Sequence, residues 1–305
     1  MPSSVEYVET TRRLWSDLGL PGLFDVHTHF LPPRVMAKVR RQFDTAGPLI
    51  GSTWPLAYRG PDEELIATLR GFGVRRFSAL SYAHRPGMAE FLNDWSFEFA
   101  DRTPGCLRSA TFYPEPDAAS YVVQRLEAGA EIFKVHVQVG GFDVRDPLLG
   151  EVWGVLEDAG IPVVVHAGSG PVGTPYTGPG PVADLLASHP RLALVIAHLG
   201  APEYAEFLAL AETYERVLVD TTMVFTPFFD RLGAAYPHEL VPRLRELQPK
   251  VLLGSDFPNI PYPYAEQLAG LARLDLGDDW LRDVCWRNAV RLFGESESCS
   301  GRSSP

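Results

Sequence analysis

The sequence contains few cysteines, and no two of them are spaced as in a disulfide or metal-binding motif. Cys106, Cys285 and Cys299 are the only three in 305 residues, and they lie far apart in the chain. This spacing excludes a disulfide framework and argues against a metal site built from thiolates. A reducing cytoplasm is the compartment that fits this cysteine usage best.

Clusters of basic residues and long apolar runs are also absent. Acidic residues exceed basic ones, 38 against 27, which gives a formal net charge of −11. Nucleic acids and anionic membranes attract clustered Lys and Arg, so neither is expected as a partner. No stretch is long and apolar enough to span a bilayer, and the charged N-terminal segment lacks the apolar core of a signal peptide. The expected partner is a small molecule, and assembly as a homo-oligomer stays open.

No glycine-rich phosphate loop follows any apolar run, which argues against a doubly wound sheet in two domains. Short apolar runs alternate instead with segments of helical pattern. The expected strands are Phe24–His29, Val74–Ser81, Leu107–Tyr113, Glu131–Val137, Ile161–His166, Leu192–His198, Val217–Thr222 and Val251–Ser255. The expected helices are Val8–Leu18, Pro61–Arg70, Met88–Asp101, Pro116–Ala128, Leu148–Ala159, Pro181–Ser188, Pro202–Tyr214, Leu240–Leu247, Tyr264–Leu274 and Asp279–Phe293.

This order of elements predicts an α/β protein with a (β/α)₈ TIM barrel. Apolar strands that are each followed by a helix form parallel sheets covered by helices, and eight such units close into a barrel. Lys134, His166 and His198 recur every 32 residues at equivalent strand ends, which agrees with a regular repeat of strand and helix. We expect one domain over residues 1–294, with a long loop after the first strand and C-terminal helices, and a disordered tail over 295–305.

Four of the expected strands end in residues that bind metals. Phe24-Asp25-Val26-His27-Thr28-His29 carries two histidines one residue apart, which share a face of an extended strand. Later strands end in His166, His198 and Asp256. The carboxyl ends of barrel strands form the active face of this fold. Nitrogen and carboxylate donors without thiolates suit a catalytic divalent ion such as zinc, which activates water.

The chain resembles the amidohydrolase superfamily, in the amidohydrolase family 2 branch that includes aminocarboxymuconate semialdehyde decarboxylase and related hydrolases. The resemblance rests on the paired histidines and on four later stretches: Val165-His166-Ala167-Gly168, Ala197-His198-Leu199-Gly200, Gly254-Ser255-Asp256-Phe257-Pro258 and Arg287-Asn288-Ala289. It implies one divalent ion, zinc or alternatively manganese, held by His27, His29, His166 and Asp256. It also implies that His198 is the catalytic acid/base, and that Asp256 orients the water or takes its proton.

Other polar residues are candidates for contacting the substrate. Lys134 and His136 share a face of the fourth strand at the barrel mouth. In binuclear members of the superfamily a lysine on this strand is carbamylated and bridges two ions, whereas in this branch it is commonly not a ligand. Arg34 and Trp54, in the long loop, suit a carboxylate and an aromatic ring respectively. Asp220, at the end of the seventh strand, is expected to support the site.

These features predict a metal-dependent hydrolase of a small-molecule amide, lactone or related carbonyl bond. The alternative is a nonoxidative decarboxylase of a small carboxylic acid, because the same ligands serve both reactions. A ligand-binding protein that has lost catalysis would lack a ligand or the acid/base, and none is missing here.

Overall fold

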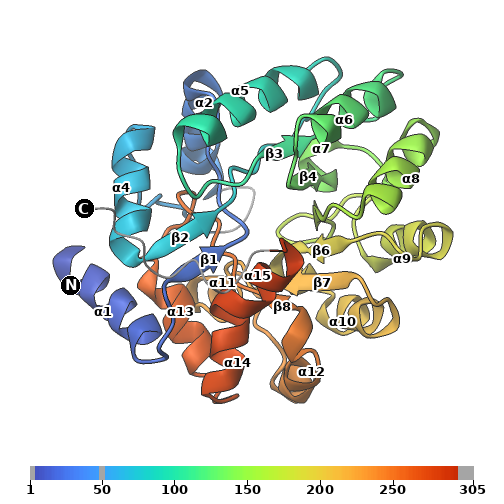
Figure 1. Ribbon diagram of the computed structural model, residues 1–305. Helices are drawn as coiled ribbons and strands as arrows, with labels where there is room; N and C mark the ends of the chain where they lie inside the picture. Colours follow the sequence, from blue (N-terminus) through green and yellow to red (C-terminus); the bar gives the residue numbers. More distant parts are fainter. Residues whose placement is uncertain (1–3, 48–51, 295–305) are drawn as a thin grey trace.

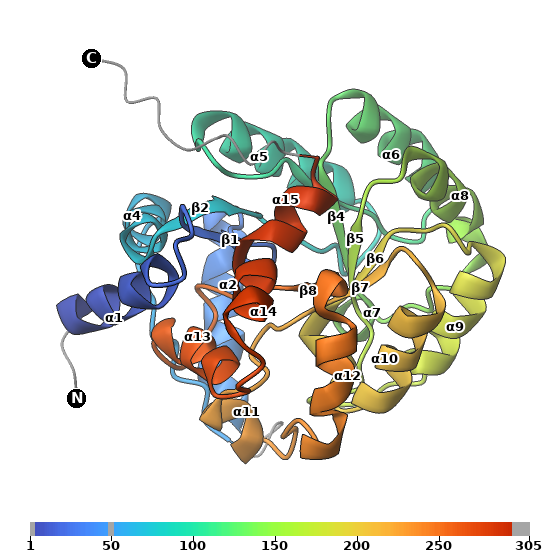
Figure 2. The same ribbon diagram turned by 60° about the horizontal axis from the view of Figure 1, so that its bottom comes forward.

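The strands lie at the centre of the molecule and helices surround them (Figures 1 and 2). The computed structural model describes residues 4–47 and 52–294, so the predicted tail over 295–305 lies outside the described residues. The strands are β1 (Leu23–Asp25), β2 (Val74–Phe77), β3 (Ser109–Thr111), β4 (Ile132–His136), β5 (Val163–His166), β6 (Leu194–Ile196), β7 (Val217–Asp220) and β8 (Val251–Leu252).

The helices alternate with these strands along the chain, as the sequence predicts. They are α1 (Ser4–Ser16), α2 (Pro33–Thr45), α4 (Asp62–Phe72), α5 (Ala89–Arg102), α6 (Ala118–Glu127), α7 (Val137–Gly140), α8 (Gly150–Ala159), α9 (Pro179–Ser188), α10 (Tyr204–Thr213), α11 (Pro227–Arg231), α12 (Val241–Glu246), α13 (Ala265–Ala272), α14 (Asp278–Arg282) and α15 (Asn288–Leu292). Among the described residues, no helix has the length and apolar character needed to cross a lipid bilayer.

Parallel pairing of the strands produces the barrel. β1 pairs with β2, and β3 to β8 pair in chain order. Backbone hydrogen bonds also connect the two sheets at both junctions. Leu107 N donates to Phe77 O at 2.8 Å between the β2 and β3 regions, and Val26 N donates to Leu253 O at 2.9 Å between the β1 and β8 regions. The eight strands therefore form the predicted TIM barrel, with side chains buried on both faces as in other parallel barrels. Val164 and Val195, for example, have no exposed surface.

Most strands end sooner than the sequence predicts. The strand expected over Leu192–His198 ends at Ile196, and the one expected over Val251–Ser255 ends at Leu252. The reason is local backbone conformation, since His198 and Asp256 have positive φ angles of 55° and 71°, which a strand cannot accommodate. His198 and Asp256 thus lie in irregular segments just after the strands. Strained backbone of this kind often accompanies functional sites.

The segment predicted as a long loop after the first strand contains helix α2. Pro33 begins this helix, and its fixed φ suits the first helical position. After α2 the chain returns across the barrel mouth, where Ala57 N donates to Ile260 O at 2.8 Å. The long segment expected after the first strand is therefore present, and it contains helix α2, which carries buried Met36.

Asn288 connects the last helix to the start of the last strand. Its side chain is 2% exposed, and Nδ2 donates to Gln248 O and Val251 O at 2.7 Å each. Because β8 leads directly to Asp256, this contact helps to hold the strand that positions Asp256.

Replacing Asn288 with Ala should lower the free energy of unfolding by about 1–3 kcal/mol, because two buried carbonyl groups lose their donor. Urea titration measures this as a lower midpoint with an unchanged slope. Gln124→Ala, on the exposed face of α6, is the matched control and should change stability by less than about 0.5 kcal/mol. Equal stability of the two variants would contradict the role given to Asn288.

Candidate metal centre

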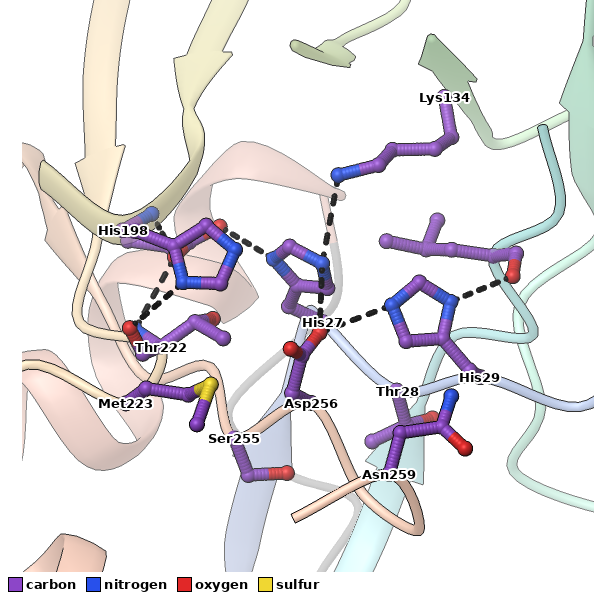
Figure 3. Close-up of polar contacts among 12 residues, drawn as sticks. His27, Thr28, His29, Lys134, His198, Thr222, Met223, Ser255, Asp256 and Asn259 are labelled. Atoms are coloured by element: carbon purple, nitrogen blue, oxygen red, sulfur yellow. Dashed lines mark hydrogen bonds and ion pairs between the residues drawn. The ribbon is translucent and has the colours of Figure 1, made fainter. Parts of the chain in front are cut away.

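Three ligand-type side chains converge at the carboxyl end of the barrel. The nitrogen atoms of His27 and His29 and an oxygen of Asp256 lie within 4.8 Å of one another. Asp256 Oδ1 is 2.9 Å from His29 Nε2 and 3.3 Å from His27 Nε2 (Figure 3). All three side chains are largely removed from solvent, with Asp256 the most exposed at 14%. Two imidazoles and a carboxylate are a donor set that divalent zinc or manganese accepts.

Hydrogen bonds orient both histidine rings. His27 Nδ1 lies 2.8 Å from Asp220 Oδ2, and His29 Nδ1 lies 2.8 Å from Leu80 O. A carboxylate and a carbonyl oxygen only accept, so each Nδ1 carries a proton, and each Nε2 is the ring atom turned towards Asp256. Burial, followed by the charge of Lys134, lowers the pKa of His27 to about 4, which keeps this ring neutral. Both Nε2 atoms therefore face Asp256, and that of the neutral His27 ring keeps its lone pair.

His198, which follows β6, lies next to His27 at the same end of the barrel. Its ring centroid is 5.3 Å from that of His27, and its Nδ1 donates to Thr222 O at 3.0 Å. The Nε2 atom of His198 thus also carries a lone pair. Burial lowers the pKa of His198, so the neutral ring is able to accept a proton.

Asp220 supports both of these histidines, as the sequence predicts. Its Oδ2 accepts from His27 Nδ1, and its Oδ1 accepts from the backbone N of His198 at 2.9 Å. Burial acts to raise the pKa of Asp220, but the interaction with His27 outweighs it and holds the pKa below its usual value. A charged carboxylate behind a metal-binding imidazole orients the ring and increases its basicity.

Lys134 points into the site from β4. Its side chain is almost completely buried, and Nζ lies 3.3 Å from His27 Nε2 (Figure 3). Burial lowers the pKa of Lys134 to about 8. The amine therefore lies beside the position that a metal would take, where it can meet an anionic group of a substrate.

His166 and His136 form a stacked pair next to His198. Their ring centroids are 3.8 Å apart with planes inclined by 12°, and the His166 ring is 4.7 Å from that of His198. His166 Nε2 donates to Gly170 O at 3.3 Å. The structure therefore does not include His166 in the three-residue cluster, although the sequence predicts it as a ligand.

His136 has the opposite tautomer. Its Nδ1 accepts from the backbone N of Val139 at 3.4 Å and so caps helix α7. Because burial holds the pKa of His136 well below its usual value, the ring is neutral and its proton lies on Nε2. The free ring nitrogen of His136, Nε2, is thus a hydrogen-bond donor, whereas the free ring nitrogen of His198, also Nε2, is an acceptor.

Tyr82 is a site residue that the sequence analysis missed. Its ring lies 5.9 Å from that of His29 and 5.0 Å from that of His136, between centroids. Its position just after the second strand was the available signal, because polar residues at such strand ends line the active face. Tyr82 therefore forms part of the wall between the paired histidines and the stacked pair.

Arg34 and Trp54, the two candidates from the long loop, differ in their exposure to solvent. Arg34 is exposed in the first turn of α2. Trp54 is 9% exposed, and its indole N–H donates to Asn259 O at 2.8 Å. Its ring packs against Phe43 and Phe228, with centroids 5.2 and 4.8 Å away. Trp54 therefore fastens the loop to the segment after β8, and the substrate contacts expected of both residues stay predictions.

Comparison with solved structures shows the same fold in other proteins. A TIM-barrel protein from Bordetella bronchiseptica has a TM-score of 0.71 at 18% identity, covering 89% of this chain and 99% of that one. A manganese-bound variant of 5-carboxyvanillate decarboxylase from Novosphingobium aromaticivorans has a TM-score of 0.63 at 12% identity, covering 92% and 98%. A probable 2-pyrone-4,6-dicarboxylic acid hydrolase from Acinetobacter baumannii has a TM-score of 0.59 at 14% identity, covering 90% and 99%.

These distant structural similarities show the fold alone, and a family model identifies the family. No curated protein matches the chain. The amidohydrolase family model, in contrast, matches residues 24–294, which include every residue of the metal centre described above. The chain therefore belongs to the amidohydrolase family of metal-dependent enzymes.

Proposed function

We propose that this enzyme hydrolyses a carbonyl-centred bond, such as an amide or a lactone, in a small molecule. The observation that carries the proposal is the convergence of His27 Nε2, His29 Nε2 and Asp256 on one position. The lone pair of His198 lies on one side of that position and the amine of Lys134 lies on another. This arrangement offers a metal site, a proton acceptor and a cation within one buried space.

One divalent ion is the cofactor we propose, with zinc first and manganese as the alternative. His27, His29 and Asp256 would hold it, with His166 as the fourth ligand once its ring leaves Gly170 O. When bound, such an ion lowers the pKa of water towards neutrality and polarises a carbonyl oxygen. The N/O donor set supports either metal, and a manganese-bound structure exists among the similar folds.

The protein's own groups would move the proton and orient the substrate. His198 Nε2 would take a proton from the attacking water and later return it to the leaving group. The bond from its Nδ1 to Thr222 O holds the ring in place for both steps. Lys134 Nζ and His136 Nε2 would donate to oxygen atoms of the substrate, which favours a carboxylated molecule.

Nonoxidative decarboxylation is the second candidate, and Lys134 is the observation that favours it. No ion pair to Lys134 occurs within the part of the chain that the structure describes, so its buried amine could bind a substrate carboxylate beside the metal position. Hydrolases and decarboxylases both occur among proteins of similar fold.

A panel of amides, lactones and aromatic carboxylic acids would separate the two reactions. We expect hydrolysis products, identified by mass spectrometry, without release of carbon dioxide. Stoichiometric carbon dioxide from any panel member, with no water added to the product, would replace hydrolysis by decarboxylation. His198→Asn should abolish the activity found and thereby show that it belongs to this site.

Elemental analysis of the purified protein should find close to one zinc or manganese ion per chain. His27→Ala should lose most of the ion, because the remaining ligands hold it far more weakly. His84→Ala removes an exposed histidine and is the matched control, which should keep the ion. Active protein that contains no metal and resists strong chelators would refute the proposed cofactor.

Substitution of two histidines separates the proton acceptor from the ligand. His198→Asn should lower kcat by about 10²–10⁴-fold while most of the metal stays bound, as expected for loss of a general base. His166→Asn should lose both metal and activity if His166 is the fourth ligand. Metal content measured on both variants decides the point, and equal metal loss would move His198 into the ligand set.

A further inference from the structure

A groove in the described part of the chain lies away from the candidate metal centre. It has a volume of about 590 Å³ and is lined by Arg12, Trp15 and Ser16 of α1, Arg70 of α4, and Gly73 and Arg75 beside the start of β2. Helices α1 and α4 lie side by side here (Figures 1 and 2). Since the groove meets β2 at its amino end, it is at the opposite end of the barrel from His27, His29 and Asp256.

Backbone carbonyl groups hold the lining side chains in place. Trp15 Nε1 donates to Phe72 O at 2.9 Å, and Arg12 Nε donates to Gly71 O at 2.6 Å. Each of these arginines has five N–H donors, so Arg12 keeps four for another partner. The groove is therefore partly organised before any ligand enters.

Gly73 allows the indole ring to lie against the backbone. Its φ of 92° is in the left-handed region that favours glycine. A Cβ atom on Gly73 would lie 2.5 Å from ring atoms of Trp15. Only glycine thus permits both the end of α4 and the close approach of Trp15, which forms an apolar wall of the groove.

Among the side chains that the structure describes, none of Arg12, Arg70 and Arg75 pairs with a carboxylate, and no acidic residue lines the groove. Arg70 has a backbone partner, because its Nη2 donates to Pro104 O at 3.2 Å. Their neighbours in sequence differ, because Arg13 pairs with Glu9 at 3.7 Å and Arg76 pairs with Glu131 at 3.3 Å. In a chain of net charge −11, three unpaired guanidinium groups around one groove are a local excess of positive charge.

We propose that this groove binds a small organic anion, whose phosphate or carboxylate oxygens contact Arg12, Arg70 and Arg75 and whose ring or apolar part lies on Trp15. Guanidinium groups bind both oxyanions through paired hydrogen bonds. A groove of this volume falls within the range of about 300–1,000 Å³ that small-molecule sites occupy. The site is independent of the hydrolytic or decarboxylating activity, and its occupation stabilises the folded protein by mass action.

Titration calorimetry on the full chain tests the proposal with phenyl phosphate and with benzene-1,3-dicarboxylate, at constant ionic strength. We expect saturable binding of at least one probe, and comparison of the two identifies the preferred oxyanion. Inorganic phosphate serves as the probe without a ring and should bind more weakly. Arg12→Gln and Arg75→Gln should each weaken binding by roughly ten-fold, as expected for loss of a charge-assisted contact.

Arg13→Gln is the matched control, since it removes an exposed arginine from the same helix that pairs with Glu9. Binding to this variant should stay within about two-fold of the wild type, because an isolated surface charge contributes little. The indole N–H resonance of Trp15, assigned with Trp15→Phe, should move on titration. Absence of binding, equal loss in Arg13→Gln, or loss in Lys134→Met, which would place the anion at the metal centre, would each overturn the proposal.

Discussion

The carboxylate of Asp220 is the contact on which the metal centre depends. One oxygen accepts the Nδ1 proton of His27 and the other accepts the backbone N–H of His198. A single buried anion on β7 thus sets the tautomer of a proposed ligand and the position of the proposed proton acceptor. If this carboxylate were neutral or absent, His27 could place its proton on Nε2, and the lone pair that faces Asp256 would be lost.

The barrel supplies this contact by bringing together strands that are far apart in the chain. His27 lies just after β1 and Asp220 ends β7, and their side chains form a hydrogen bond, while the turn after β8 brings in Asp256. That turn is anchored by Asp256 N, which donates to His27 O at 2.8 Å. The positive φ of Asp256 and of His198 shows that the backbone leaves regular strand geometry at the proposed ligand and at the proposed proton acceptor. Rigid strands below the site hold these strained residues in position.

The sequence predicts the barrel and most of the site, because each of its signals is local. Apolar runs that end in His27 and His29, His166, His198 or Asp256 can be read without knowing what lies beside them. The hydrogen bonds of His29 to Leu80 O and of His198 to Thr222 O involve backbone groups that carry no sequence signal. The sequence does not predict helix α2, because its neighbourhood is rich in proline and glycine, which mask a helical pattern. The packing of Trp54 is equally hidden in the sequence, since its partners Phe43, Phe228 and Asn259 become neighbours only in the folded chain.

The number of ions in the proposed centre depends, in our proposal, on the chemical state of Lys134. A free amine beside His27 suits one ion, whereas a carbamate on Lys134 would bridge two. A crystal structure of the zinc-loaded protein, with anomalous diffraction measured at the zinc absorption edge, tests this most directly. We predict a single peak at about 2.0–2.2 Å from His27 Nε2, His29 Nε2 and a carboxylate oxygen of Asp256. A peak away from these atoms, or two peaks joined by a carbamate on Lys134, would contradict it.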